Sequence, residues 1–348
     1  MGAGDAHRIK LKKIFQEVLV VKKLIMAAMI CSLAAPAVAE EAVKVSGSVE
    51  IQYRSSEDFY DDKTNEYTVA DGGETGGDVI RPEELYIQIS KKIDKGVEAL
   101  LKLDGADMDK DGNDSKYVEE AQLIFSDLGL KGLSIVAGKD EMPFGQDYEK
   151  FFFDSVTHGL EIDKVWGLHG IYKIKGLGTA AAAVFERDRA VDTKVQDSFA
   201  AKATIDQLVK NLSVEVSTAR LGKDRSAPAP ADKDESRLSA GAVFKLSDFT
   251  FHAEKTIIVD YDNIKDYDLD VTQVGADYKF RKFLFKVRQE IIDNDNPDPL
   301  DDREELKLAG GADYYFSDKT FVAAEFEFTK WDIADDSEEI LLGVKFLF

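Results

Sequence analysis

The residues of this chain alternate between apolar and polar along most of its length, and this period of two is the feature that most limits its fold. The segment AVKVSGSVEIQYR, residues 42–54, places Val45 and Val49 on one face and Lys44 and Glu50 on the other. The C-terminal segment EEILLGVKFLF, residues 338–348, alternates in the same way. Successive side chains of an extended strand point to opposite faces, so the pattern predicts an all-β chain.

Sixteen segments of this kind are predicted. They cover residues 42–54, 83–91, 96–105, 117–126, 132–139, 164–174, 178–187, 197–206, 211–220, 236–246, 249–258, 270–280, 283–292, 304–316, 320–331 and 338–348. Seven of the links between them are short, and the other eight are longer, polar and acid-rich. An even number of strands joined alternately by short turns and long loops is typical of an antiparallel outer-membrane β-barrel with periplasmic turns and extracellular loops.

A soluble β-sandwich also alternates, so the period alone leaves two architectures open. The polar stripe favours the barrel, because it carries charges of both signs that would line a water-filled lumen. Aromatic residues also gather beside the short links, as they do at a membrane interface. These are Phe249, Phe251, Tyr278, Phe280, Phe283, Phe285, Tyr314 and Phe316. Because a sheet in hydrocarbon has to close on itself, a transmembrane barrel in the bacterial outer membrane is predicted.

Residues 1–39 are predicted to be a cleaved signal peptide. Lys22 and Lys23 precede the apolar run LIMAAMICSLAAP, and Ala37-Val38-Ala39 forms an A-x-A cleavage site. Translation is expected to start near residues 20–21. Residues 40–348 then form a single barrel domain, and cleavage removes Cys31, the only cysteine.

Composition excludes several function classes. The chain carries 67 Asp and Glu against 45 Lys and Arg, a net charge of −22, so no nucleic-acid partner is expected. One Cys and four His leave no thiolate-based metal site, and no nucleophile elbow or phosphate-binding loop is present. We therefore predict no enzyme activity and no cofactor.

The third long link interrupts the alternation and is a candidate for folding into the lumen, where fixed charges would select among ions. Residues Phe151, Phe152 and Phe153 could anchor it on the wall; the alternative is a surface loop. The candidate constriction residues are Lys139, Glu141, Asp147, Glu149, Lys150 and Asp154 in this segment, with Lys102, Lys286, Arg288, Glu325 and Glu327 on the wall.

The stretch GKDEMPFGQ followed by HGLEID resembles an element of the legiobactin-type siderophore porins, which are similar to the phosphate-selective porins. The matching positions are Gly138, Lys139, Pro143, Phe144 and Gly145, within about 30 residues. The resemblance implies an outer-membrane channel for small solutes. Phosphate-selective members line their pores with basic residues, whereas the loops here are acidic and the wall is mixed.

Two further predictions concern metal binding and assembly. Asp107, Asp109, Asp111 and Asp114 have the opening spacing of a calcium loop, but Val118 stands where a bidentate Glu belongs, so weak Ca²⁺ binding competes with a simple solvated acidic loop. Phe346 and Phe348 are predicted to be a signal for the barrel-assembly machinery. Outer-membrane lipid and lipopolysaccharide are the other expected partners, and assembly as a homotrimer is left open.

The predicted function is passive diffusion of small hydrophilic solutes or ions through the barrel. The acidic outer mouth should raise the local cation concentration, which predicts a mild cation preference. The alternatives are a channel specific for siderophores or iron, and a non-conducting barrel that holds a surface or electron-transfer partner.

Overall fold

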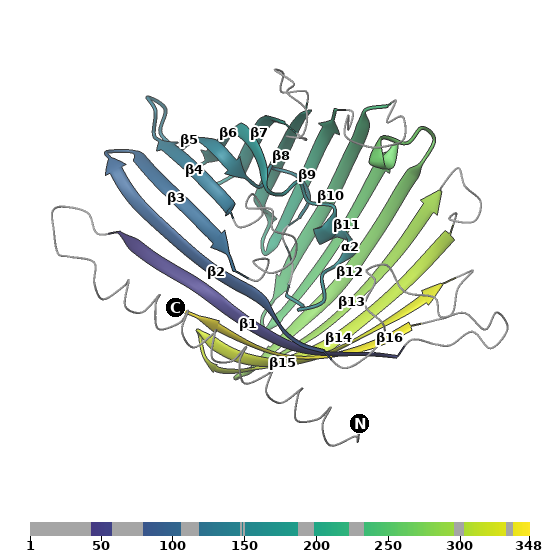
Figure 1. The fold of residues 1–348 in the computed structure, drawn as a ribbon. Helices are drawn as coiled ribbons and strands as arrows, with labels where there is room; N and C mark the ends of the chain where they lie inside the picture. The colour runs from purple at the N-terminus through teal and green to yellow at the C-terminus, as the bar shows by residue number, and fades with distance from the viewer. Residues whose placement is uncertain are drawn as a thin grey trace, which may run out of the picture.

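Sixteen antiparallel strands form a closed barrel in the computed structural model of the chain (Figure 1). The structure describes residues 43–57, 79–105, 118–146, 148, 150–186, 198–222, 233–295, 303–331 and 337–348. Each strand pairs with its neighbours in the sequence, and β16 pairs with β1 to close the sheet. The strands are β1 (Lys44–Glu57), β2 (Val79–Asp94), β3 (Val97–Asp104), β4 (Val118–Ser126), β5 (Leu133–Asp140), β6 (Val165–Ile174), β7 (Gly178–Glu186), β8 (Ser198–Val209), β9 (Leu212–Leu221), β10 (Glu235–Leu246), β11 (Phe249–Val259), β12 (Asp268–Phe280), β13 (Phe283–Asp295), β14 (Arg303–Ser317), β15 (Thr320–Trp331) and β16 (Ser337–Leu347). The predicted all-β barrel of sixteen strands is confirmed.

The largest differences from the predicted strand limits lie at strand ends. The strand predicted at 83–91 runs over Val79–Asp94, and the one predicted at 283–292 continues to Asp295. Alternation is required only where one face contacts apolar surroundings, whereas backbone pairing continues beyond that zone, as it does into the polar residues Asp293, Asn294 and Asp295 of β13. The sequence pattern therefore underestimates strand length where the chain leaves the apolar zone.

The apolar face of the sheet is exposed and the charged face is buried, which is the reverse of the arrangement in a soluble protein. On β13 the outward Phe283 and Val287 are 41% and 58% exposed, while the inward Lys286 and Glu290 are 2% and 0% exposed. Water-soluble proteins rarely bury such charges and hide their large apolar residues instead. The soluble β-sandwich is therefore wrong, because it would bury the apolar stripe. The outer face needs an apolar solvent, which a bilayer provides.

Tight turns join the strands at one end of the barrel. The β8–β9, β10–β11 and β12–β13 turns each contain a residue with positive φ, namely Asn211, Ser247 and Arg281, as short hairpin turns require. The predicted aromatic residues pack against one another beside these turns. For example, the ring centroids of Phe249 and Tyr278 are 4.4 Å apart.

The C-terminal residue helps to close the barrel. The Phe348 amide donates to the Gly47 carbonyl over 3.0 Å, and the Gly47 amide donates back over 3.1 Å. A side chain at residue 47 would lie 2.5 Å from the Phe348 ring, so the ring needs a glycine beneath it. The role of Phe346 and Phe348 in assembly stays a prediction. Among the described residues, no helix is long and apolar enough to span a bilayer.

Candidate functional site

The loop between β5 and β6 lies inside the barrel. In Figure 1 its short helix α2 (Val156–Gly159) lies within the ring of strands. Its residues contact the inner wall from β7 round to β16, through both side chains and backbone. The segment predicted to fold inward does so, and it is not a surface loop.

Three apolar contacts fix the loop to the wall. Each places loop residues on small or apolar side chains of the inner face, where removing apolar surface from water stabilises the contact. Met142, Phe144 and Ile162 pack on Ala183, Phe185, Ala200, Ala219 and Leu221; Leu160 packs on Ile258, Leu269, Val271 and Ile292; Phe151, Phe152 and Phe153 pack on Ala309, Ala323 and Leu341. The expected anchoring role of the three consecutive phenylalanines agrees with this packing.

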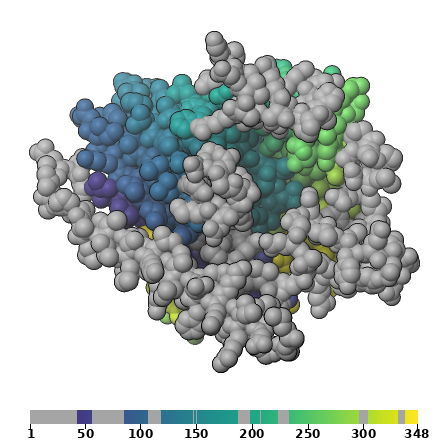
Figure 2. All heavy atoms as spheres, viewed as in Figure 1, coloured from purple at the N-terminus to yellow at the C-terminus, as the bar shows by residue number. Residues whose placement is uncertain are grey.

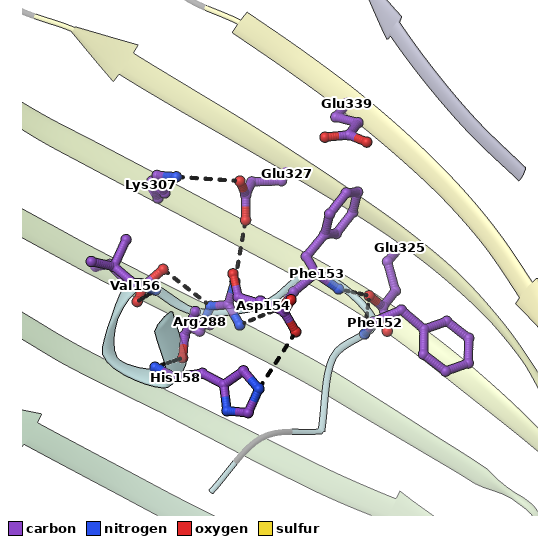
Figure 3. Close-up of polar contacts among 12 residues, drawn as sticks. Phe152, Phe153, Asp154, Val156, His158, Arg288, Lys307, Glu325, Glu327 and Glu339 are labelled. Atoms are coloured by element: carbon purple, nitrogen blue, oxygen red, sulfur yellow. Dashed lines mark hydrogen bonds and ion pairs between the residues drawn. The ribbon is translucent and has the colours of Figure 1, made fainter. Parts of the chain in front are cut away.

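Backbone amides of the loop donate to acidic side chains of the wall. Glu325 accepts from the Phe152 and Phe153 amides over 2.8 and 3.2 Å, as Figure 3 shows. Glu290 accepts from the Val156 amide over 2.9 Å. A loop has no ladder partner for these groups, and an unpaired buried amide is costly, so the wall carboxylates replace the missing β-ladder.

Basic side chains of the wall satisfy the loop's carbonyl groups in the same way. Arg288 donates from Nη1 to the Phe153 carbonyl over 2.9 Å and from Nη2 to Asp154 over 3.2 Å. Lys286 donates to the Lys150 carbonyl, and it also lies 2.5 Å from Glu325 and 2.7 Å from Asp313. In Figure 3 Arg288 lies among the loop residues Phe153, Asp154 and Val156. Charged side chains of the wall therefore form hydrogen bonds with both the amide and the carbonyl groups of the loop's backbone.

The middle of the loop is held by Tyr148. Its hydroxyl donates to Asp277 over 2.7 Å, and its ring lies 4.2 Å from the His252 ring. Lys150 also reaches Asp277 over 2.7 Å. Burial, followed by the hydrogen bond to Asp277, raises the pKa of the Tyr148 phenol, because both disfavour the phenolate. The loop is therefore held by a neutral phenol at physiological pH.

These contacts divide the inner wall into two sectors. In the covered sector, formed by β12–β15 beneath the loop, the side chains of Lys286, Arg288 and Glu325 are 0–1% exposed. Lys286, Arg288 and Glu325 were expected to line the constriction. That expectation needs correction, because the loop separates them from water and they hold the loop instead.

The open sector contains the wall charges that water reaches. On β3 and β4, Lys102 and Glu120 lie 3.3 Å apart with side chains 26% and 25% exposed. On β7, Ala181 lines a cavity of about 280 Å³ beside the start of the loop, whereas Ala183 and Phe185 of the same strand lie under the loop. Figure 2 shows β3–β8 in blue to teal on the left of the view and the strands coloured green on the right.

The remaining predicted constriction residues differ in exposure. On the loop, Glu141 is exposed, and the side chains of Lys150 and Asp154 are 39% and 71% exposed. Glu327 pairs with Arg288 over 3.2 Å and is 13% exposed. Lys139 is buried and donates to the Val118 carbonyl. Of the loop residues predicted to form the constriction and described by the structure, Glu141, Lys150 and Asp154 are therefore the ones that a solute can meet.

The residues of the sequence motif shape the entry into the loop. Gly138 has φ +145°, and a Cβ there would lie 1.9 Å from the Ala121 carbonyl oxygen. Gly145 has φ +72°, donates to Ser217 and accepts from Lys202, while Phe144 is 2% exposed and Pro143 lies between. The motif therefore has a structural explanation, a close strand approach followed by a left-handed turn.

Some predicted residues lie outside the described residues. These are Asp147 and Glu149 in the loop, the calcium-loop candidates Asp107, Asp109, Asp111 and Asp114, and the signal peptide. Within the described ranges, no group of three or more His, Cys, Asp or Glu residues could hold a metal ion. The Ca²⁺ prediction is untouched by this, since its residues are not described.

The wall residues on which the loop packs were not identified from the sequence. Ala309, Ala323 and Leu341 interrupt the polar stripe of β14–β16, and each is at most 5% exposed. An apolar residue on a face that should meet water is a usable signal that something apolar covers it. The inner charges were identified by the period of two, but no pattern distinguished those facing water from those facing the loop.

Solved structures of similar shape include an outer-membrane channel, a porin and an outer-membrane protein. The outer membrane channel DcaP of Acinetobacter baumannii superposes with a TM-score of 0.67 at 15% identity, covering 88% of this chain and 97% of that one. An anion-selective porin from Comamonas acidovorans also gives 0.67, at 13% identity, covering 89% and 100%. A trimer form of OmpT from Vibrio cholerae gives 0.61 at 13% identity, covering 89% and 100%. At these identities the likeness concerns the fold alone.

The comparisons at sequence level are of two kinds. No curated protein sequence gives a significant match to the chain. A family model described as Gram-negative porin matches residues 26–333.

Proposed function

The chain belongs to the Gram-negative porin family, and from this premise we propose that it is a passive pore for small hydrophilic solutes with a mild preference for cations. It is an outer-membrane channel for solute diffusion, as the family and the sixteen-stranded barrel indicate. The observation that carries the proposal is the divided lumen. A fixed loop covers one sector, while charged side chains in the other remain accessible to water.

The ion preference rests on the long links, not on the wall. The wall charges that water reaches pair with opposite charges, as Lys102 does with Glu120, so their fields largely cancel. The sequence of the long links is rich in Asp and Glu, as in DNDNPDPLDD at 293–302. An acidic mouth concentrates cations, and salt screens the effect over about 10 Å at 0.1 M.

Planar bilayers test both parts of the proposal. The purified protein should show stable single-channel conductance, and its reversal potential in a KCl gradient should favour K⁺ weakly, more so at low salt. A preference for chloride would contradict the proposed cation preference, while the proposal that the barrel conducts ions would still stand. Absence of conductance would favour the alternative, a non-conducting barrel that holds a surface or electron-transfer partner.

The finer assignments remain predictions. The family match leaves the legiobactin-type and phosphate-selective resemblance as a hypothesis about solutes, carried by Gly138, Pro143, Phe144 and Gly145. A channel specific for siderophores or iron is the corresponding alternative, and competition of such solutes with ion current would test it.

Homotrimer formation is supported by the trimer form of a protein of similar fold. Binding of lipopolysaccharide, weak Ca²⁺ binding and recognition by the barrel-assembly machinery are proposed from sequence alone.

A further inference from the structure

A cavity of about 600 Å³ lies between the loop and the turn end of β12–β16. Phe151 and Phe152 of the loop form its roof. Residues of the β12–β13 and β14–β15 turns, including Lys282 and Asp318, line the opposite side, together with Lys345 of β16. Short turns are periplasmic in this architecture, so the cavity is on the periplasmic side of the loop. Its volume is in the range of small-molecule sites.

The cavity is basic although the chain is acidic. Five basic residues line it, Lys150, Lys279, Arg281, Lys282 and Lys345, against the acidic Asp313 and Asp318. Asp313 is buried and lies 2.7 Å from Lys286, which also pairs with Glu325. Lys279 and Lys282 are exposed and form no ion pair with an acidic residue that the structure describes. Lys150 is paired with Asp277 and Lys345 with Glu50. The excess of positive charge in the cavity therefore comes from Lys279, Arg281 and Lys282 against Asp318, within a chain of net charge −22.

One wall of the cavity is aromatic. Tyr315 and Phe321 stack with centroids 4.9 Å apart, and Phe321 stacks on Phe152 at 5.7 Å. Tyr315 and Phe321 come from β14 and β15, and Phe152 of the inward-folded loop extends the aromatic surface. Stacked rings offer a surface to a flat apolar body, and nearby ammonium groups offer partners to an anion.

We propose that this cavity binds flat organic anions, specifically carboxylates carried on an aromatic ring. The ring would lie against Tyr315 and Phe321, and the carboxylate would face Lys279 and Lys282. An inorganic anion would lack the apolar contact, and an aromatic cation would meet positive charge. The inference rests on the proposed pore only for access from water, and binding itself needs no conduction.

The test uses 2-naphthoate, whose fluorescence reports binding and whose block of ion current reports position. We expect saturable binding to the purified protein and block at lower concentration from the periplasmic than from the extracellular side. Naphthylmethylammonium and acetate should bind at least about tenfold more weakly. The variant Lys279→Gln, Lys282→Gln should weaken naphthoate binding by about tenfold, which corresponds to about 1.4 kcal/mol.

A matched control separates the site from general electrostatics. Lys210 and Lys245 are exposed lysines at the turn end of β8–β10, outside the cavity. Lys210→Gln, Lys245→Gln should leave binding unchanged within twofold. Equal loss in both double variants, or equal binding of the aromatic cation, would overturn the proposal. Naphthoate binding without conductance would instead contradict the pore proposal and leave this site standing.

Discussion

The covered and open sectors of the inner wall use the same residue types for different purposes. In the covered sector the Lys286 and Glu325 side chains are 0% exposed and hold the loop. In the open sector Lys102 and Glu120 form a similar pair but remain a quarter exposed. A buried charge needs its partner, whereas an exposed one is already solvated by water. The same inward-facing position is therefore structural in one sector and available to solutes in the other.

The largest expected difference between the sectors comes from removing one lysine in each. Lys286→Met leaves Asp313 and Glu325 buried without their cation, which should destabilise the protein by about 3–5 kcal/mol and loosen the loop. Lys102→Met should cost under about 1 kcal/mol. Thermal unfolding in detergent measures the stability, and single-channel conductance should rise for Lys286→Met. Equal losses of stability would remove the distinction between the sectors.

A second contrast uses two glycines of the wall. A Cβ at Gly343 would lie 2.1 Å from the Phe152 ring, so Gly343→Ala should displace the ring and cost about 1–3 kcal/mol. Gly170 lies on the outward face of β6, and apart from its chain neighbours no atom lies within 4 Å of the added Cβ, so Gly170→Ala should have little effect. Thermal unfolding and conductance of both variants test this. A silent Gly343→Ala would contradict tight packing of the loop on β16.

The barrel was predictable from the sequence to a larger extent than the sectors. Alternation identified all sixteen strands, because one face meets an apolar phase and the other meets polar groups. The inward fold of the loop was predictable from the break in alternation and from Phe151–Phe153. Whether an inward charge contacts water or the loop depends on where the loop crosses, a long-range relation such as that between Glu325 and Phe152. The alternation of apolar and polar residues along each strand carries no information about where the loop crosses the wall.

The Tyr148 hydroxyl provides a smaller test within the covered sector. Because the pKa of this phenol is raised above its ordinary value of about 10, the neutral form contributes its stability below that pH. The contribution is lost as the pH rises through the folded-state pKa. The difference in stability between the wild type and Tyr148→Phe should be about 1 kcal/mol and constant from pH 6 to 9, and should decline above about pH 10.

A difference that varied with pH between 6 and 9 would show that another group, such as His252 beside the Tyr148 ring, controls this attachment. Unfolding in denaturant at fixed pH values is the appropriate measurement, because the wild type and the variant then share every other titrating group.

The smallest expected effect concerns ion selectivity in the open sector. One exposed charge changes the energy of an ion at contact distance by about 1 kcal/mol in water. Lys102→Gln removes one such charge, and with screening by salt it should shift the ratio of cation to anion permeability towards cations by less than about fivefold. Reversal potentials in a salt gradient measure this ratio. A shift towards anions would show that ions do not pass near Lys102.

Three alanines allow the central claim to be tested directly by cysteine accessibility in a Cys31→Ser background. Ala181 lines the open sector, Ala323 lies under the phenylalanines of the loop, and Ala324 is on the outer face. A charged, water-soluble thiol reagent should modify Ala181→Cys rapidly in the reconstituted barrel and leave Ala323→Cys and Ala324→Cys unmodified. A reaction at Ala323→Cys as fast as at Ala181→Cys would contradict the division of the lumen.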